Sequence, residues 1–213
     1  MIPTAERVIL VGLEHEGVSR WDLQDSLEEL RLLTDTAGAK VVETVIQRLD
    51  KPTAPFYIGK GKAEEIAKSS GEKQATSVIF DDELSPAQSR NLEEITHRKV
   101  IDRSQLILDI FAARARTREG RLQIELAQLQ YLLPRLTGMW SHLSRQSGGI
   151  GTRGPGETQL EKDRRAIARR IDKLQRDVQK LREHRARIRS SRHGLQRFAL
   201  VGYTNAGKSS LLN

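Results

Sequence analysis

The chain has 213 residues and a net charge of +8, with 30% charged and 37% hydrophobic residues. This composition excludes a wholly disordered chain, and the lack of any apolar run of about 18 residues argues against a membrane-spanning helix. There is no cysteine, so disulfides and thiolate metal sites are excluded. Because the N-terminus also lacks a secretory signal pattern, the sequence predicts a cytoplasmic protein.

Charge is distributed unevenly along the chain. Residues 1–103 carry a net charge of −5, whereas residues 104–213 carry +13. This asymmetry predicts two modules with different partners, and the arginine-rich second half suits contacts to phosphate groups. A solvated helical face is the alternative interpretation of the same charge.

Short apolar or β-branched runs alternate with helical patterns in the first half. The patterns predict strands at residues 7–13, 40–49, 76–81 and 99–102, and helices at residues 22–37, 61–70 and 85–97. Ser85, Pro86 and Gln88 form a predicted capping box. The order predicts an α/β domain over residues 1–103 with a mostly parallel sheet, whose ligand crevices lie at the strand carboxyl ends.

Two apolar seams predict long helices over residues 104–194. Pro134 should kink or break the first helix, and the glycine-rich residues 146–156 separate the two. The pattern therefore predicts a long antiparallel two-helix, coiled-coil-like domain that needs no second chain, hence a monomer. The first seam comprises Leu122, Leu126, Leu129, Leu133, Leu136, Trp140 and Leu143, and the second comprises Ile167, Ile171, Leu174, Val178, Leu181 and Ile188.

A strand predicted at residues 196–201 leads into GYTNAGKS, which fits the P-loop pattern G-x-x-x-x-G-K-[ST]. The glycines allow backbone N–H groups to face phosphate oxygens, Lys208 adds a positive charge, and Ser209 offers a hydroxyl to Mg²⁺. A glycine-rich turn with a chance lysine is the alternative. The predicted nucleotide-binding residues are Gly202, Tyr203, Thr204, Asn205, Ala206, Gly207, Lys208 and Ser209, with Ser209 also the predicted metal ligand.

Three other patterns are weaker. The segment Gly59–Gly61, with Lys60 and Lys62, fits a small anion-binding turn, although a simple loop is favoured. Asp81, Asp82 and Glu83 lie at the end of a predicted strand, and an exposed turn is favoured over a metal site. Trp21 and Trp140 are expected to be packing residues rather than platforms for base stacking.

Several segments resemble HflX-type GTPases, a family related to translation factors. The resembling segments are FYIGKGKAEEI at 56–66, DDELSPAQSRNLE at 81–93, VIDRSQLILDIFAARARTREGRLQIELAQLQYLLPRL at 100–136, GGIGTRGPGETQLEKDRR at 148–165 and GYTNAGKSSLLN at 202–213. The resemblance implies an α/β domain, then a helical linker domain, then the start of a truncated Ras-like G domain at residues 195–213.

The same resemblance implies GTP and Mg²⁺ as cofactors and GTPase activity in the complete protein. No Walker-B motif follows the P-loop here, so this chain alone is expected to hydrolyse no GTP, which a Mg²⁺-dependent turnover assay would test.

The resemblance also implies binding to the large ribosomal subunit and its rRNA, with nucleotide-dependent ribosome splitting or rescue. A basic helical hairpin with a glycine-rich tip suits irregular RNA. The alternative is an RNA-binding or ATP-dependent RNA-remodelling module whose nucleotide is bound by residues 1–103. The predicted rRNA contacts are Gly149, Gly151, Arg153 and Gly154 in the loop and Arg164, Arg165 and Arg169 on the following helix.

Overall fold

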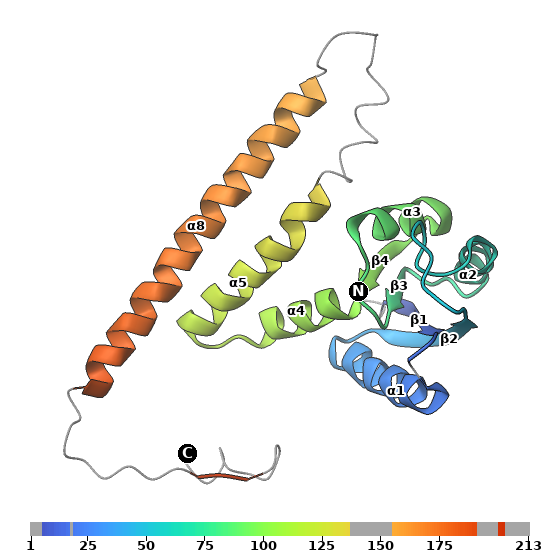
Figure 1. The fold of residues 1–213 in the computed structure, drawn as a ribbon, viewed down its shortest axis with the longest axis horizontal. Coiled ribbons are helices and arrows are strands. Elements are labelled where there is room, and N and C mark those ends of the chain that lie inside the picture. The colour runs from blue at the N-terminus through green and yellow to red at the C-terminus, as the bar shows by residue number, and fades with distance from the viewer. Residues whose placement is uncertain (1–5, 18, 137–154, 191–199, 203–213) are drawn as a thin grey trace, which may run out of the picture.

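The computed structural model describes residues 6–17, 19–136, 155–190 and 200–202. Figure 1 shows an α/β unit from which a helical arm, formed by the helices α5 and α8, extends to one side. The elements are β1 (Arg7–Glu14), α1 (Arg20–Thr36), β2 (Lys40–Arg48), α2 (Lys60–Glu72), β3 (Ser77–Phe80), α3 (Pro86–Thr96), β4 (Lys99–Asp102), α4 (Arg103–Arg114), α5 (Arg118–Leu132), the 3₁₀ helix η1 (Leu133–Arg135) and α8 (Pro155–Ser190).

The four strands form one parallel sheet in the order β2-β1-β3-β4, which confirms the predicted parallel sheet. Val11 of β1 pairs with Val45 of β2 on one side and with Phe80 of β3 on the other. Because β1 has a strand on each side and helices over both faces, its residues from Val8 to Val11 are all buried. The sheet therefore supplies the centre of the molecule's core.

Helices α2 and α3 cover one face of the sheet, and α1 and α4 cover the other. Alternate residues of β1 contribute to the two faces, as expected for a strand. Ile9 and Val11 pack with Ile66 of α2 and Leu92 of α3. On the opposite face, the core consists of Val8, Leu10, Leu23, Leu27, Leu30, Ile79, Ile101, Leu106 and Ile110.

The packing of α1 on β1 leaves little room for a side chain at position 12. A Cβ atom there would lie 2.9 Å from Leu23 Cδ1 and 3.0 Å from Leu27 Cδ1. Contacts under 3.0 Å would force the helix or its side chains to move, and both leucines belong to the buried core. A larger residue at position 12 would therefore require these two leucines to shift.

The helix starts confirm part of the predicted capping. The capping box of Ser85 and Gln88 is present at α3, with Pro86 in its first turn. The predicted start of α2 at residue 61 is one residue late, because Gly59 is the N-cap and Lys60 begins the helix. Gly59 donates its N–H to Gln47 Oε1 at 2.9 Å, which fixes this N-cap beside β2.

Helix α4 belongs to the α/β unit by its packing. Leu106 and Ile110 are buried with α1 and β3 on one face of the sheet. The predicted domain boundary after residue 103 therefore falls before a helix that packs on the sheet. The chain leaves this unit at Ala115, whose backbone is extended, and α5 begins after the N-cap Thr117.

Helices α5 and α8 lie side by side in the arm (Figure 1). Ile171, Leu174 and Val178 of the second predicted seam are buried. Two ion pairs join the helices: Arg170 Nε bonds Glu125 at 2.8 Å, and Arg185 pairs with Glu119 at 2.7 Å. The later arginine of α8 therefore pairs with the earlier glutamate of α5. Helix α5 ends at Leu132, just before Pro134, where the sequence predicts a break.

Several predicted features lie outside the described residues. These include residues 146–154 of the predicted glycine-rich loop, Trp140, Leu143 and most of the strand predicted at 196–201. The predicted end of that loop at residue 156 is wrong, because α8 begins at Pro155. The two described residues of that strand, Leu200 and Val201, are exposed and belong to no strand. Trp21 is 78% exposed, so the expectation that it is a packing residue is wrong. No described helix is both long and apolar enough to cross a bilayer.

Candidate nucleic-acid interface

The outward face of α8 carries a row of six exposed cations. Burial of Ile171, Leu174 and Val178 fixes how α8 is rotated about its own axis. At about 100° per residue, the six cations fall within an arc of about 60°, roughly opposite these three buried residues. We name this row the cationic stripe; it comprises Lys162, Arg169, Lys173, Arg176, Lys180 and Arg187.

The cationic stripe is long and narrow. From Lys162 to Arg187 it covers roughly 37 Å of helix at 1.5 Å per residue. Its members follow one another at spacings of 7, 4, 3, 4 and 7 residues. A linear series of positive charges on a rigid helix can follow a phosphate backbone, which carries negative charges at regular intervals.

Within the described part of the chain, no ion pair involves the cationic stripe. Its one side-chain hydrogen bond there joins Arg176 Nε to the Asp172 carbonyl at 3.2 Å. Other α8 arginines are neutralised: Arg165 by Glu161 in the same helix, and Arg170 and Arg185 by glutamates of α5. The structure thus separates the cations that are paired with carboxylates of the arm from those left for an external anion.

The structure disperses the predicted arginine cluster around α8. Arg164, Arg165 and Arg169 are all exposed. Helical geometry turns Arg164 about 140° away from Arg169, and Arg165 is paired with Glu161 at 2.8 Å. Only Arg169 belongs to the cationic stripe. The predicted loop contacts Gly149, Gly151, Arg153 and Gly154 lie outside the described residues.

Of the predicted P-loop, only Gly202 is among the described residues, where it is exposed and belongs to no helix or strand. Tyr203–Ser209 therefore remain predictions from the sequence, with Ser209 as the predicted Mg²⁺ ligand. Their chemistry still fits the phosphate of a nucleotide, through Lys208 and several backbone N–H groups.

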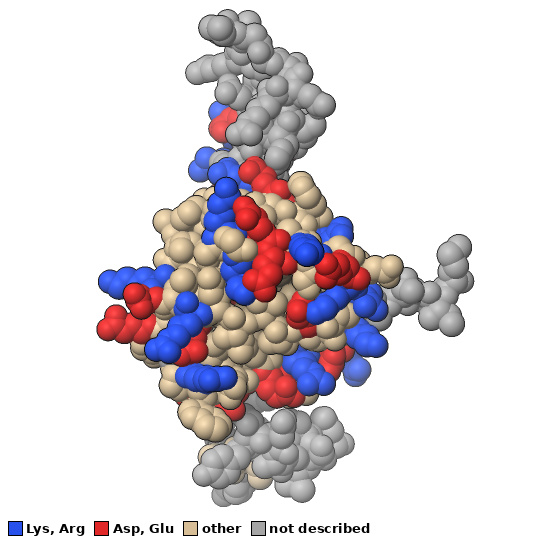
Figure 2. Space-filling model, turned by 90° about the vertical axis from the view of Figure 1, so that its right-hand side faces the viewer, with Lys and Arg blue, Asp and Glu red and all other residues tan. Residues whose placement is uncertain are grey.

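The anion-binding turn considered at Gly59–Gly61 has few free charges. Lys62 forms an ion pair with Glu65 at 2.5 Å, and Lys60 lies 3.8 Å from Glu64. Figure 2 shows blue and red side chains interspersed over the face of the molecule that it presents, with no large area of one sign. The paired lysines do not support an anion-binding turn, and the favoured simple loop is wrong too, because Lys60 and Gly61 belong to α2.

The carboxyl ends of the strands form a dense polar edge. The expected exposed turn at Asp81 is wrong: Asp81 is 8% exposed and pairs with Arg103 of α4 at 2.9 Å. Arg103 also pairs with Glu29 and donates to Ser26 Oγ of α1 at 2.7 Å. Among the described residues, no group of three or more His, Asp or Glu side chains could hold a metal ion.

Two tyrosine hydroxyls donate to aspartates at this edge. Tyr57 bonds Asp82, and Tyr131 of α5 bonds Asp102 Oδ2 at 2.7 Å. Burial, reinforced by these hydrogen bonds and by the negative charge of the aspartates, raises the pKa of both phenols. Tyr57 also adopts φ = 67°, a left-handed backbone that is uncommon for a bulky residue, and its ring packs edge-on against Phe80.

Alkaline titration should show these raised pKa values. In a Tyr203→Phe chain, Tyr57 and Tyr131 are the only tyrosines. A raised folded-state pKa means that ionisation favours unfolding, so both phenols stabilise the fold below about pH 10 and lose that contribution as the pH rises further. We expect tyrosinate absorbance to appear together with the loss of circular dichroism. Tyrosinate forming near pH 10 in a chain that stays folded would contradict this.

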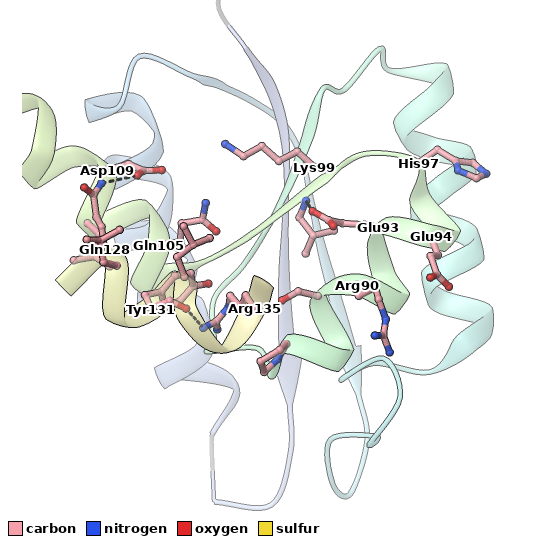
Figure 3. A pocket seen from close by; sticks show the side chains of 16 residues that line it. Arg90, Glu93, Glu94, His97, Lys99, Gln105, Asp109, Gln128, Tyr131 and Arg135 are labelled. Carbon is pink, nitrogen blue, oxygen red and sulfur yellow. Dashed lines mark hydrogen bonds between the residues drawn. The ribbon is translucent and has the colours of Figure 1, made fainter. Parts of the chain in front are cut away.

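A cavity of about 870 Å³ lies between the α/β unit and the arm (Figure 3). Its walls come from α3, β4, α4 and α5, beside the free edge of β4. The labelled side chains in Figure 3 include cations from several elements and a hydrogen bond between Gln128 and Asp109. Its cationic lining residues are Arg90, Lys99 and Arg135. Its size lies in the range of small-molecule sites.

Neither the cationic stripe nor the role of Asp102 was predicted from the sequence. The stripe was detectable, because the Lys/Arg spacing follows the same heptad period as the apolar seam, half a turn away. For Asp102 there was no comparable signal, because its partners Tyr131 and Arg135 lie 29 and 33 residues further along the chain.

Comparisons with known proteins agree with this architecture. A family described as GTP-binding GTPase N-terminal matches residues 24–112, and one described as GTP-binding GTPase Middle Region matches residues 114–192. The chain is 54% identical over 212 residues to the GTPase HflX of Alkalihalophilus pseudofirmus, covering 98% of this chain and 49% of that protein. It is 49% identical over 194 residues to the GTPase HflX of Escherichia coli, covering 90% and 45%.

A solved structure is also similar. It is a GTP-binding protein from the archaeon Sulfolobus solfataricus in complex with GDP, with 26% identity, a TM-score of 0.56, and coverage of 97% of this chain and 52% of that one. The fold and the matches define the class of this chain as the N-terminal and middle regions of a GTP-binding GTPase. The chain belongs to the HflX family. It spans about half the length of the curated relatives it matches.

Proposed function

We propose that this chain is the RNA-contacting part of a ribosome-associated GTPase, which binds the large ribosomal subunit and promotes nucleotide-dependent ribosome splitting or rescue. The observation that carries the RNA contact is the cationic stripe on α8, six exposed cations with no ion pair among the described residues. The HflX-type resemblance suggests the ribosome as the source of the RNA. Protein–RNA affinity of this kind depends mainly on phosphate contacts.

Nucleotide binding is proposed for Gly202–Ser209, with Lys208 on the β- and γ-phosphates and Ser209 on Mg²⁺. The relatives named GTPase HflX and the archaeal protein in complex with GDP support a guanine nucleotide. We further propose that α5 and α8 act as one antiparallel hairpin domain. The glycine-rich residues 146–154, including Arg153, would form its RNA-contacting tip.

Co-sedimentation with isolated ribosomal subunits tests the proposal. The chain should pellet with the large subunit and not with the small one, and binding should weaken as salt rises, because phosphate contacts release counterions. The small subunit is the matched control, since it presents the same phosphate chemistry in a different shape. Equal binding to both subunits would reduce the interaction to non-specific charge attraction, and no binding at low salt would refute the proposed partner.

The cavity in Figure 3 favours a second candidate, an ATP-dependent RNA-remodelling module whose nucleotide is bound by the α/β unit. Arg90, Lys99 and Arg135 line this cavity beside apolar surface. Calorimetry with ATP on a Lys208→Ala chain distinguishes the two sites, because that variant removes the P-loop lysine. Saturable ATP binding would support this alternative, and no binding would remove it.

A further inference from the structure

Asp102 joins the sheet to the helical arm. It ends β4 and is 1% exposed. Its carboxylate accepts four hydrogen bonds: from the Leu84 N–H at 3.2 Å, the Gln105 N–H at 2.9 Å, the Tyr131 hydroxyl at 2.7 Å and Arg135 Nη2 at 3.2 Å. These donors belong to the loop before α3, to α4, to α5 and to η1. One buried charge therefore connects four segments.

Arg135 closes this network from the side of the arm. It also donates to the Leu84 carbonyl at 2.7 Å and to the Tyr131 carbonyl at 3.0 Å. Its guanidinium carbon lies 3.4 Å from the centre of the Tyr131 ring. Its side chain is only 14% exposed, so the ion pair with Asp102 is shielded from water. Figure 3 shows Tyr131 and Arg135 side by side at the edge of the cavity.

The other connections described between α4 and α5 are weaker. Gln128 of α5 donates to Asp109 of α4 at 3.4 Å, and both side chains belong to the open wall of the cavity. The covalent link is the short segment Ala115–Thr117. A short link with few polar contacts would allow the arm many orientations relative to the α/β unit. The network of Asp102, Tyr131 and Arg135 selects one of them, because any other direction would leave a buried charge unpaired.

The direction of the arm matters because α8 is long. Its 36 residues correspond to a helix of about 54 Å, so a rotation of about 10° at one end displaces the other by about 9 Å. Such a displacement exceeds the length of a hydrogen bond several times over. A series of phosphate contacts could not survive it without rearrangement.

We propose that Asp102, Tyr131 and Arg135 are positioning residues that set the direction of the arm relative to the sheet and thereby orient the cationic stripe. The first part concerns this chain alone. The second part rests on the proposed RNA-binding function. None of the three residues needs to touch RNA.

Distances between two spin labels, measured by double electron–electron resonance, test the first part. The chain has no cysteine, so Lys68→Cys on α2 and Gln175→Cys on α8 give two unique labelling sites, both exposed. The labelled chain should give one narrow distance distribution. Asp102→Asn and Tyr131→Phe should each broaden it at least twofold, while circular dichroism remains that of the folded chain. The milder Tyr131→Phe variant keeps the test informative if Asp102→Asn fails to fold.

Asp109→Asn is the matched control, because it alters a carboxylate between α4 and α5 that lies outside the network, and it should leave the distribution unchanged. Unchanged widths in both network variants would overturn the proposal, as would equal broadening by the control. The measurement contains no ribosome, so it stands even if the large subunit proves to be the wrong partner. If the unaltered chain binds the large subunit, Tyr131→Phe should weaken that binding at least threefold. An unchanged affinity despite a broadened distribution would overturn the second part.

Discussion

Substitution of Asp102 by alanine is expected to lower the free energy of unfolding by about 3–5 kcal/mol, the usual effect of removing one partner of a buried ion pair. The change leaves Arg135 buried without its carboxylate and removes the acceptor of the Leu84 and Gln105 N–H groups and of the Tyr131 hydroxyl. It also removes the N-cap of α4. Urea unfolding followed by circular dichroism measures the loss.

Glu83→Ala is the control for this substitution. Glu83 lies in the loop next to Leu84 and is exposed, so its removal should change the free energy of unfolding by less than about 0.5 kcal/mol. A loss below about 1 kcal/mol for Asp102→Ala would mean that water or a rearranged neighbour replaces the carboxylate. The edge of the sheet around Asp102 would then be more accessible to water than its hydrogen bonds indicate.

Neutralising the centre of the cationic stripe should weaken RNA binding by about 100-fold at low salt. The variant is Lys173→Gln, Arg176→Gln and Lys180→Gln, which removes three charges that form no ion pair in the described part of the chain. If each meets one phosphate, the slope of log affinity against log salt should fall by about 2 to 3, at 0.7 to 0.9 per contact. Fluorescence anisotropy with labelled rRNA across a salt series measures both quantities.

The ion-paired arginines of α8 provide a control with the same change in charge. Arg165→Gln, Arg170→Gln and Arg185→Gln also remove three charges, but these are already neutralised by Glu161, Glu125 and Glu119. Their exposed pairs contribute little to stability. We expect this variant to keep most of the affinity and the salt slope. Equal losses in the two variants would show that total charge, rather than the stripe, determines binding.

Sequence patterns predicted the α/β unit well because its signals are local. The strands of the sheet lie within one residue of their predicted ends, and the capping box at Ser85 is present. Apolar runs, β-branched residues and caps act over a few residues, so they can be recognised without the fold. The family resemblance also rested on contiguous segments, and the HflX relatives confirm it.

The misjudged residues at the sheet edge share a physical cause. Asp81 was expected in an exposed turn, yet its carboxylate is buried against Arg103, which lies 22 residues further on. Helix α4 was expected with the arm, yet it packs on the sheet through Leu106 and Ile110. In each case the environment is made by residues distant in sequence, and the local pattern is the same whether or not that partner is present.

The sequence by itself determined the parallel α/β unit, the apolar seams of the arm and the family, because each follows from short-range periodicity or contiguous motifs. The tertiary structure decided which cations of α8 are neutralised by α5 and which form the cationic stripe. It also decided that Asp102 binds Tyr131 and Arg135, through which the arm is held to the sheet. Such pairings depend on how helices are rotated and packed, and long-range burial fixes that rotation only once the chain has folded.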